Sequence, residues 1–274
     1  MPVISTNNAA NTAVRYLNIN SQQQSDSLAK LASGSRITKA SDDAAGLAIS
    51  TRLSSDVTTL SQAATNASHA VSVLQTADGG ASNISDILQR MKALATEANS
   101  GTVTTSDLKD IDAEFQQLID QIDSIATATR YNGTSLLDGT SAYTTGVSVM
   151  VGSKATDSIT MTIASLTSTS LAVGTLDVTS AANAQTALTA LDTAINTVSD
   201  SRAMIGALES RFQFSADSVA TTQENLSAAN SAITDVDVAA EQAKLSSASV
   251  KVQAAVAAAA QANQMPQYLL NLLK

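Results

Sequence analysis

Apolar residues recur at every seventh position along one stretch in the second half of the chain. Seven of them form this series: Leu191, Val198, Ile205, Phe212, Val219, Leu226 and Ile233. Such a spacing keeps one face of a helix turned toward a partner helix along its whole length. At 1.5 Å per residue the series spans ~63 Å. The pattern therefore predicts a long helix with a core seam that packs against other long helices.

Two further helices supply partners for this seam. The first carries its own series of positions seven apart: Leu53, Leu60, Ala67, Leu74, Ala81, Leu88 and Ala95. This series passes Gly79-Gly80 without a shift, so we expect one helix there, at a cost of ~1 kcal/mol per glycine. Asn99-Ser100-Gly101 ends it, and the short link makes the next helix its antiparallel neighbour. The seam of that next helix is Leu108, Ile111, Phe115, Leu118, Ile122 and Ile125.

Polar residues mark where these helices begin. Ser41 is the expected N-cap of the first, with Asp42 and Asp43 in the first turn, where the helix dipole favours carboxylates. Ser106 is the expected N-cap of the second, followed by Asp107.

The helices expected at the two ends of the chain have weaker seams. Over residues 3–31 the apolar positions are Val3, Ala10, Val14, Leu17, Leu28 and Leu31, with Asn7, Ser21 and Gln24 at other seam positions. Ser33-Gly34-Ser35 breaks this helix, and Asp235-Val236-Asp237 precedes an Ala-rich helix over about 238–264 that Pro266 ends or kinks. Both arms have too few large side chains to offset the entropy of ordering them as monomers.

A small β region lies in the middle of the chain. Asn132-Gly133 and Asp138-Gly139 are turn signals. Residues 147–151 and 159–163 then alternate apolar and polar positions, which predicts a hairpin, and 164–180 reads as loop or irregular strand. The fold class is therefore mainly α, with long antiparallel helices in a coiled-coil-like bundle and one small β-hairpin region.

The amino-acid composition limits the kinds of molecule that the chain is expected to bind. Apolar residues make up 44% of the chain but aromatic residues only 3%, and charged residues 14%, which favours close helix packing with flanks that contact further protein. The net charge is −9 without a Lys/Arg cluster, so nucleic-acid binding is disfavoured. There is no cysteine, which excludes disulfides and thiolate metal sites. We expect neither a Sec-type signal peptide nor a membrane span, because the Ala-rich end is interrupted by Lys251 and several amides.

The sequence gives little support for any catalytic or metal-binding residue. His69 is the single histidine and is expected to be structural. Asp42 and Asp43 are more consistent with capping or pairing to Arg36 than with acid–base chemistry, and Asp235 and Asp237 lack the rest of a calcium loop. No nucleotide-binding, hydrolase or metalloprotease motif is present. We therefore expect no enzymatic activity and no cofactor.

Four segments carry a resemblance to a known family. They are LASGSRITKASDDAAGLAIS at 31–50, LQTAD at 74–78, YNGTSLLDG at 131–139 and AQANQMPQYLLNLL at 260–273. Together they resemble the bacterial flagellins, in order over nearly the whole chain. Ser35 and Thr38 stand where Leu and Asn are more usual, and Asn230 stands where an Arg is common.

The resemblance implies a structural subunit that polymerises by itself into the flagellar filament, the helical propeller of swimming bacteria. It implies an inner coiled-coil layer (D0, residues 1–46 and 235–274) and an outer helical rod (D1, residues 47–234) with the hairpin near 140–180 and no large surface domain. It further implies export without a cleaved signal peptide to an extracellular location. The partners it implies are the flagellar export apparatus, a flagellin chaperone, the filament cap, the hook-associated proteins and other flagellins.

The resemblance also assigns candidate surfaces. The inner-layer arms would use Val14, Leu17, Leu28, Leu31, Val250 and Leu269. In similar flagellins a mammalian innate immune receptor recognises the residues that match Arg90, Leu94 and Glu114. In this chain Lys92 and Ala93 replace the Arg and Glu that are usual in the same patch. Contact with a neighbouring subunit is the alternative role for that patch. The Ser/Thr-rich region 140–180 either carries O-linked sugars or is an unmodified loop.

Two other functions stay open at this point. One is a hook–filament junction protein of the same fold. The other, from a different class, is an amphipathic lipid-binding helical protein, disfavoured by the absence of Trp and of apolar faces flanked by Lys and Arg.

Overall fold

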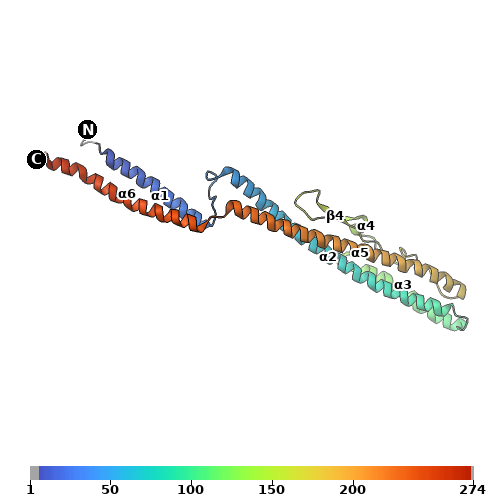
Figure 1. Ribbon diagram of the computed structural model, residues 1–274. Coiled ribbons are helices and arrows are strands. Elements are labelled where there is room, and N and C mark those ends of the chain that lie inside the picture. Colours follow the sequence, from blue (N-terminus) through green and yellow to red (C-terminus); the bar gives the residue numbers. More distant parts are fainter. Residues whose placement is uncertain (1–5, 273–274) are drawn as a thin grey trace. The chain divides into compact units, whose positions relative to one another are not determined.

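A computed structural model describes residues 6–272, with side chains described for 6–265 (Figure 1). The helices are α1 (Asn8–Ser33), α2 (Ala44–Ala98), α3 (Thr105–Ala128), α4 (Ala142–Thr145), α5 (Ala181–Thr234) and α6 (Val238–Leu272). The strands are β1 (Arg130–Tyr131), β2 (Thr134–Ser135), β3 (Val147–Met150) and β4 (Ser158–Met161). The predicted fold class of long packed helices is confirmed.

The chain forms two compact units. The terminal unit consists of residues 1–55 and 225–274, and the central unit of residues 56–224. The helices α2 and α5 each contribute residues to both units. We describe each unit by itself.

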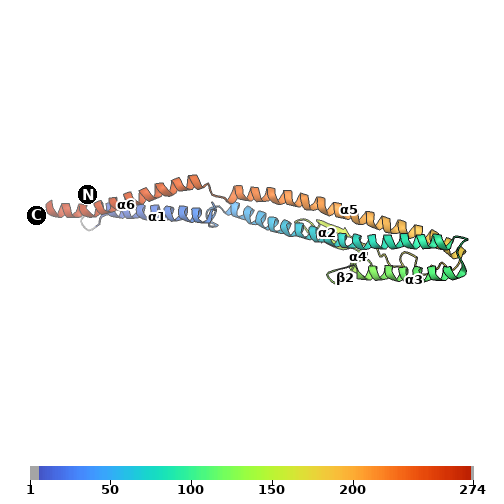
Figure 2. The ribbon, with the colours of Figure 1, turned by 90° about the horizontal axis from the view of Figure 1, so that it is seen from below.

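The core of the central unit is the seam that the heptad series predicts. Leu191, Val198, Ile205 and Phe212 on α5 are at most 1% exposed, as are Ala67, Leu74, Ala81, Leu88 and Ala95 on α2. Figure 2 shows α2 between α5 and α3 in this unit. The ion pair Arg202–Asp78 joins α5 to α2 and the pair Arg90–Glu114 joins α2 to α3. Burial decreases along the seam, since Val219 is 8% exposed and Leu226, Ile233 and Leu53 are only half-buried.

The helix α2 runs through Gly79-Gly80 without a break, as the unshifted series predicts. Gly80 has a packing role. A Cβ at this position would come within 2.8 Å of Leu137 Cδ1 and would overlap the Thr129 side chain. The segment after α3 can therefore lie against α2 only because Gly80 has no side chain, which explains a residue that costs helix stability.

The β region contains two antiparallel hairpins instead of the single one expected. The predicted hairpin is β3–β4, in which Val149 pairs with Ile159. The second is β1–β2, closed by Asn132-Gly133 with Asn132 at φ 48°. The sequence marks this turn, but each flanking strand has only two residues, too few for an alternating pattern.

The loop 164–180 is anchored to α3 and is not a freely solvated segment. The Asp123 carboxylate accepts hydrogen bonds from Ser168 N at 2.8 Å and Ser168 Oγ at 2.7 Å. Asp112 Oδ1 accepts from Val178 N at 2.9 Å. The four apolar side chains Leu166, Leu171, Val173 and Val178 enter the core. Thr169 and Ser170 of this loop remain exposed.

In the terminal unit α1 and α6 lie side by side and antiparallel, as Figures 1 and 2 both show. The side of α1 that is least exposed is made of small, polar and two larger residues: Ala10, Ala13, Leu17, Asn20, Gln24, Ser27 and Leu31. Val14 and Leu28, expected in this seam, are instead 47% and 58% exposed. The expected frame is therefore wrong at these two positions, because the polar side chains face α6 and the larger ones face outward. Val3 lies outside the described residues.

Three helix ends differ from expectation. The N-cap of α2 is Asp43 instead of Ser41, since Asp43 Oδ1 accepts a hydrogen bond from Gly46 N at 2.8 Å. The N-cap of α3 is Thr104 instead of Ser106, because Thr104 and Asp107 form a reciprocal capping box. The helix α6 continues past Pro266 to Leu272, because a proline removes one backbone hydrogen bond and the turns on either side keep theirs.

Two phenylalanines of α5, two positions apart in the sequence, test which face of this helix belongs to the core. Phe212 is 0% exposed and Phe214 is 76% exposed. We expect Phe212→Ala to lower the free energy of unfolding by about 3–5 kcal/mol, as for other buried aromatic residues. Phe214→Ala should change it by less than ~0.5 kcal/mol, as for surface substitutions. Denaturant unfolding of the monomer measures both, and equal effects would contradict the assignment of this seam.

Candidate functional site

The terminal helix pair turns its larger apolar side chains outward. On α1 these are Val14, Tyr16, Ile19 and Leu28, and on α6 they are Val238, Val250, Val256 and Met265. Each is at least 43% exposed. Amphipathic helices usually bury such residues against their partner, and exposed apolar patches mark interaction surfaces. The pair therefore presents a surface suited to further protein. Of the residues expected in these arms, Leu17 and Leu31 are half-buried, and the side chain of Leu269 lies outside the described residues.

A buried polar cluster fixes the alignment of α1 with α6. Glu241 is only 6% exposed, and its Oε1 accepts a hydrogen bond from Ser27 Oγ at 2.7 Å. Its other oxygen accepts from Lys244 Nζ at 2.9 Å. The hydrogen bond from Ser27, followed by that from Lys244, holds the pKa of the Glu241 carboxyl below its usual range. A buried polar pair is satisfied in one register only, so this contact opposes sliding of the helices.

A second contact aligns the other end of the pair. Asn7 caps α1 by accepting from Ala10 N, and its Nδ2 donates to the carbonyl of Ala262 at 2.7 Å. Between these two contacts α6 buries Ala248, Ala255 and Ala262, which continue at sevenfold spacing from Glu241. The alanines at these three positions allow the two helices to approach closely. The contact therefore buries little apolar area, and its main effect is to fix the alignment of α1 with α6.

The segment between α1 and α2 pairs with the segment between α5 and α6. Gly34, at φ 68°, ends α1 in the left-handed conformation that glycine adopts without strain. Arg36 N donates to Thr234 O at 2.6 Å and Arg36 Nη2 donates to Ile233 O at 2.7 Å. The expected pairing of Arg36 with Asp42 or Asp43 is therefore wrong: its guanidinium binds the free carbonyl at the end of α5.

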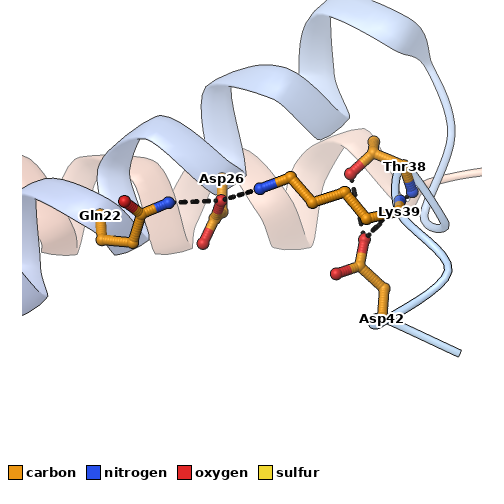
Figure 3. Close-up of polar contacts among 5 residues, drawn as sticks. All are labelled: Gln22, Asp26, Thr38, Lys39 and Asp42. Carbon is orange, nitrogen blue, oxygen red and sulfur yellow. Dashed lines mark hydrogen bonds and ion pairs between the residues drawn. The ribbon is translucent and has the colours of Figure 1, made fainter.

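Figure 3 shows how the same segment is tied to α1. Lys39 Nζ lies 3.2 Å from Asp26 Oδ1, which also accepts from Gln22. Asp42 accepts from the backbone N–H groups of Thr38 and Lys39, each at 3.1 Å. The hydrogen bond from Lys39 lowers the pKa of Asp26, and the backbone hydrogen bond from Thr38 lowers that of Asp42. Asp42 thus organises the turn before α2 and Asp43 caps the helix, whereas the sequence predicts both to lie in the first helical turn.

The remaining candidate residues lie in the central unit. Arg90 and Glu114 form an exposed ion pair at 2.7 Å, whereas Leu94 is 2% exposed and belongs to the core. Lys92 pairs with Asp192 of α5. His69 Nδ1 lies 3.2 Å from the Tyr131 hydroxyl. Among the described residues, no three His, Asp or Glu side chains are grouped as a metal site would require. No described helix is long and apolar enough to cross a membrane.

Ser27 and Glu241 are the functional residues that sequence reasoning missed. Glu241 could have been found from the sequence, because Glu241, Ala248, Ala255 and Ala262 lie seven positions apart and so mark a seam whose first residue is a glutamate. Their pairing across 214 positions of the chain has no such signal.

Comparison with known proteins agrees with this geometry. Residues 4–142 match the family described as the bacterial flagellin N-terminal helical region, and residues 188–273 match the bacterial flagellin C-terminal helical region. A flagellin of Halalkalibacterium halodurans is 37% identical over 99% of this chain and 100% of its own length. Flagellins of Listeria monocytogenes and Bacillus subtilis are each 36% identical over at least 98% of this chain and 99% of their own.

Solved structures give the same result. The crystal structure of Bacillus cereus flagellin aligns with a TM-score of 0.52 at 36% identity, covering 61% of this chain and 94% of that one. A putative flagellar hook-associated protein from Vibrio parahaemolyticus has a TM-score of 0.57 at 15% identity, covering 70% of this chain and 99% of that one, which shows a shared fold. With both terminal regions matched and full-length relatives that have no additional large domain, the chain belongs to the bacterial flagellins, as a short form of this family of filament subunits.

Proposed function

We propose that this flagellin polymerises by itself into a long extracellular filament, with the terminal unit in the inner layer and the central unit in the outer layer. The observation that carries this proposal is the helix pair α1–α6, which keeps small and polar residues inside and turns larger apolar ones outward. In a polymer those residues become buried between copies. The role is structural, and we propose no catalytic activity.

The charge distribution supports this assignment of layers. The central unit has 18 acidic and 7 basic side chains, hence a net charge of −11, and the terminal unit has 6 acidic and 8 basic ones, hence +2. Crowding many copies of a strongly charged unit together is costly, whereas solvent and salt screen such a unit at an outer surface. The nearly neutral unit is the one suited to the interior. The domain limits we propose are residues 1–46 with 235–274, and 47–234, so the terminal unit of the structure extends nine residues further into α2 and ten further into α5 than the proposed inner layer.

The arms are proposed to fold as they join the filament. Alanine seams bury little apolar area, so α1 and α6 gain little from pairing with each other alone. Arms that are disordered in the free subunit suit passage through a narrow channel. We therefore propose export in an unfolded form by the flagellar export apparatus, without a cleaved signal peptide, assisted by a flagellin chaperone. The cap, the hook-associated proteins and other flagellins are the remaining proposed partners.

The alternative functions receive less support. The hook-associated protein from Vibrio parahaemolyticus shares the fold at 15% identity, whereas the full-length relatives at 36–37% identity are flagellins. Electron microscopy of the purified chain separates the two functions, because a junction protein would not form long filaments by itself. A lipid-binding protein would float with liposomes. Of the receptor patch, Arg90 and Glu114 offer exposed side chains, and Leu94 would contribute only where the core opens.

Leu28, whose side chain points outward from α1, tests whether the helix pair α1–α6 forms contacts between copies. Leu28 is 58% exposed, so Leu28→Asp should leave monomer stability within ~0.5 kcal/mol of the original. We expect the same substitution to prevent filament formation, since it places a charge in a buried contact between copies. Gln23→Asp, at an exposed position of the same helix, is the matched control. Normal filaments of the Leu28 variant would remove the arms from the proposed interface.

Hydrogen exchange tests the folding of the arms. Backbone amides of residues 10–28 should exchange within seconds in the monomer and become strongly protected in the filament, because only there does the α1–α6 pair acquire further helices to pack against. The amides of α3 serve as the internal control and should be protected in both states. Strong protection of residues 10–28 in the monomer would contradict folding on assembly.

Acid stability tests the buried carboxylate. Because the pKa of Glu241 in the folded arms lies below its ordinary value of 4.5, its stabilising effect is complete above that pH and is lost as the pH falls further. Glu241→Gln should raise the critical concentration for assembly at pH 7 about tenfold, as expected for a lost charge-assisted hydrogen bond. Sedimentation of filaments between pH 6 and 3 should show a shallower acid transition for this variant than for Glu224→Gln. Parallel curves would argue against the role of Glu241.

A further inference from the structure

The helix pair α1–α6 has two grooves of similar size and opposite chemical character. The first, which we call the lysine groove, has a volume of about 570 Å³. It contains five charged side chains: Asp26, Lys30, Glu241, Lys244 and Lys251. The second, the uncharged groove, has a volume of about 550 Å³ and is lined by Leu28, Leu245 and Val250 among serine and glutamine side chains. No charged residue lines the uncharged groove.

The two grooves lie on opposite flanks of the pair and at the same level along it. On α1, Gln23 lines the lysine groove and Ser25 the uncharged one. Residues two positions apart in a helix point about 200° away from each other. On α6, Ser247 lines the lysine groove and the preceding Ser246 the uncharged one. All four side chains are exposed, so both grooves are open in the single chain.

The lysine groove is unfavourable to cover. Its three lysines face two carboxylates that are already bound, since Asp26 pairs with Lys39 (Figure 3) and Glu241 accepts from Ser27 and Lys244. An uncharged surface laid over this groove would remove lysines from water without offering them a partner, which is costly. The lysine groove of a second copy would bring like charges together. The uncharged groove has neither cost.

A second copy can cover the uncharged groove only with a shift along the helices. Leu28 and Val250 are 58% and 65% exposed, so covering them removes apolar area from water. Two parallel copies at the same level would set the uncharged groove of one against the lysine groove of the next, because the grooves lie on opposite flanks. An axial shift avoids that contact. Repeated from copy to copy, a contact between different surfaces with an axial shift gives an open helix and does not close into a ring.

Tyr16 and Ile19 form the surface that such a shift brings to the uncharged groove. They precede Gln23 of the lysine groove by seven and four positions, which places them on its flank. They are 53% and 43% exposed. Tyr16 lies eight residues before Gln24 of the uncharged groove, which corresponds to a shift of ~12 Å. Arg15, whose guanidinium carbon lies 5.8 Å from the centre of the Tyr16 ring, has a side chain long enough to keep its charge at the edge of this surface.

We propose that the Tyr16–Ile19 surface of one subunit occupies the uncharged groove of the next, while the lysine groove stays in contact with water. The ring of Tyr16 packs against Leu28 and Val250, and its hydroxyl group meets the serine and glutamine side chains of the groove. This inference rests on the polymerisation proposed above and specifies which flank of the arms receives the neighbouring copy.

Adjacent serines allow each groove to be probed separately, because the chain has no cysteine. We would assemble Ser246→Cys and, separately, Ser247→Cys into short filaments and measure how fast N-ethylmaleimide modifies each. Both should react at similar rates in the monomer. In filaments Ser246→Cys should react about tenfold more slowly and Ser247→Cys at nearly its monomer rate, because thiol reactions depend on access. Equal protection of the two positions, or protection of Ser247→Cys alone, would overturn the proposal.

Disulfide cross-linking tests the axial shift. Filaments that carry both Tyr16→Cys and Ser25→Cys should give a ladder of covalent multimers on oxidation, since each copy offers one thiol to each of two neighbours. The matched control is Gln23→Cys with Ser25→Cys, because these positions lie level on opposite flanks and meet only between copies without a shift. Should the Tyr16/Ser25 variant not assemble, Ile19→Cys with Ser25→Cys answers the same question.

The outcomes of cross-linking separate this contact from polymerisation itself. A ladder from the control, or intact filaments of the Tyr16/Ser25 variant without a ladder, would overturn the contact and leave the proposed polymerisation standing. Failure of the unsubstituted chain to polymerise would instead overturn the proposed function.

A charge placed in each groove gives a further measurement that needs no cysteine. Ser246→Glu should raise the critical concentration for assembly about tenfold, because its carboxylate would be buried without a partner. Ser247→Glu should change it by less than about twofold, because its carboxylate stays in water and lies one turn from Lys251. Equal effects of the two substitutions, or a larger effect of Ser247→Glu, would overturn the assignment of the two grooves.

Discussion

Long helices depend on a partner for burial, and this constraint governs the chain. A helix of 54 residues such as α5 cannot fold back on itself, so its apolar face is buried only by other helices. In the central unit the heptad series meets that need within one chain, because α2, α3 and the loop 164–180 close over it. In the terminal unit the buried positions of α6 are alanines and a glutamate. The placement of large side chains thus separates a unit that buries them within one chain from a unit that leaves several of them exposed.

Where apolar area is small, polar contacts supply the alignment. Ser27–Glu241 and Asn7–Ala262 are satisfied in one register of α1 against α6. The free carbonyls at the end of α5 are likewise bound by Arg36, which ties the two connecting segments of the terminal unit together. Each of these contacts contributes little free energy, and each would leave a polar group unpaired if the helices slid. The residues between α1 and α6 therefore set the alignment of the two helices, and the proposed contacts with other copies involve different residues, on the outer surface of the pair.

The sequence predicts most of the fold because periodicity is a local property. The long helices, the break at Gly34, the β3–β4 hairpin and the seam of α5 all follow from spacing and turn residues. The frame of α1 does not, since a hydrophobic pattern places Val14 and Leu28 inside, whereas in the structure they are exposed, as the proposed interface with other copies requires. The caps Asp43 and Thr104 each lie two residues from the expected ones, because several Ser, Thr and Asp residues compete at each helix start. The contact between Ser27 and Glu241 depends on how the two ends of the chain meet, which no local pattern records.

Gly80 affects both the stability of α2 and the packing of the segment that follows α3. A residue with poor helix propensity in the middle of α2 weakens the helix, yet its missing side chain lets Thr129 and Leu137 approach. That approach places the β1–β2 hairpin and Tyr131 beside α2, where the Tyr131 hydroxyl lies 3.2 Å from His69 Nδ1. An alanine at this position would gain helix propensity of ~1 kcal/mol and displace the hairpin segment. The position of this hairpin segment against α2 therefore depends on a glycine that lowers the stability of the helix itself.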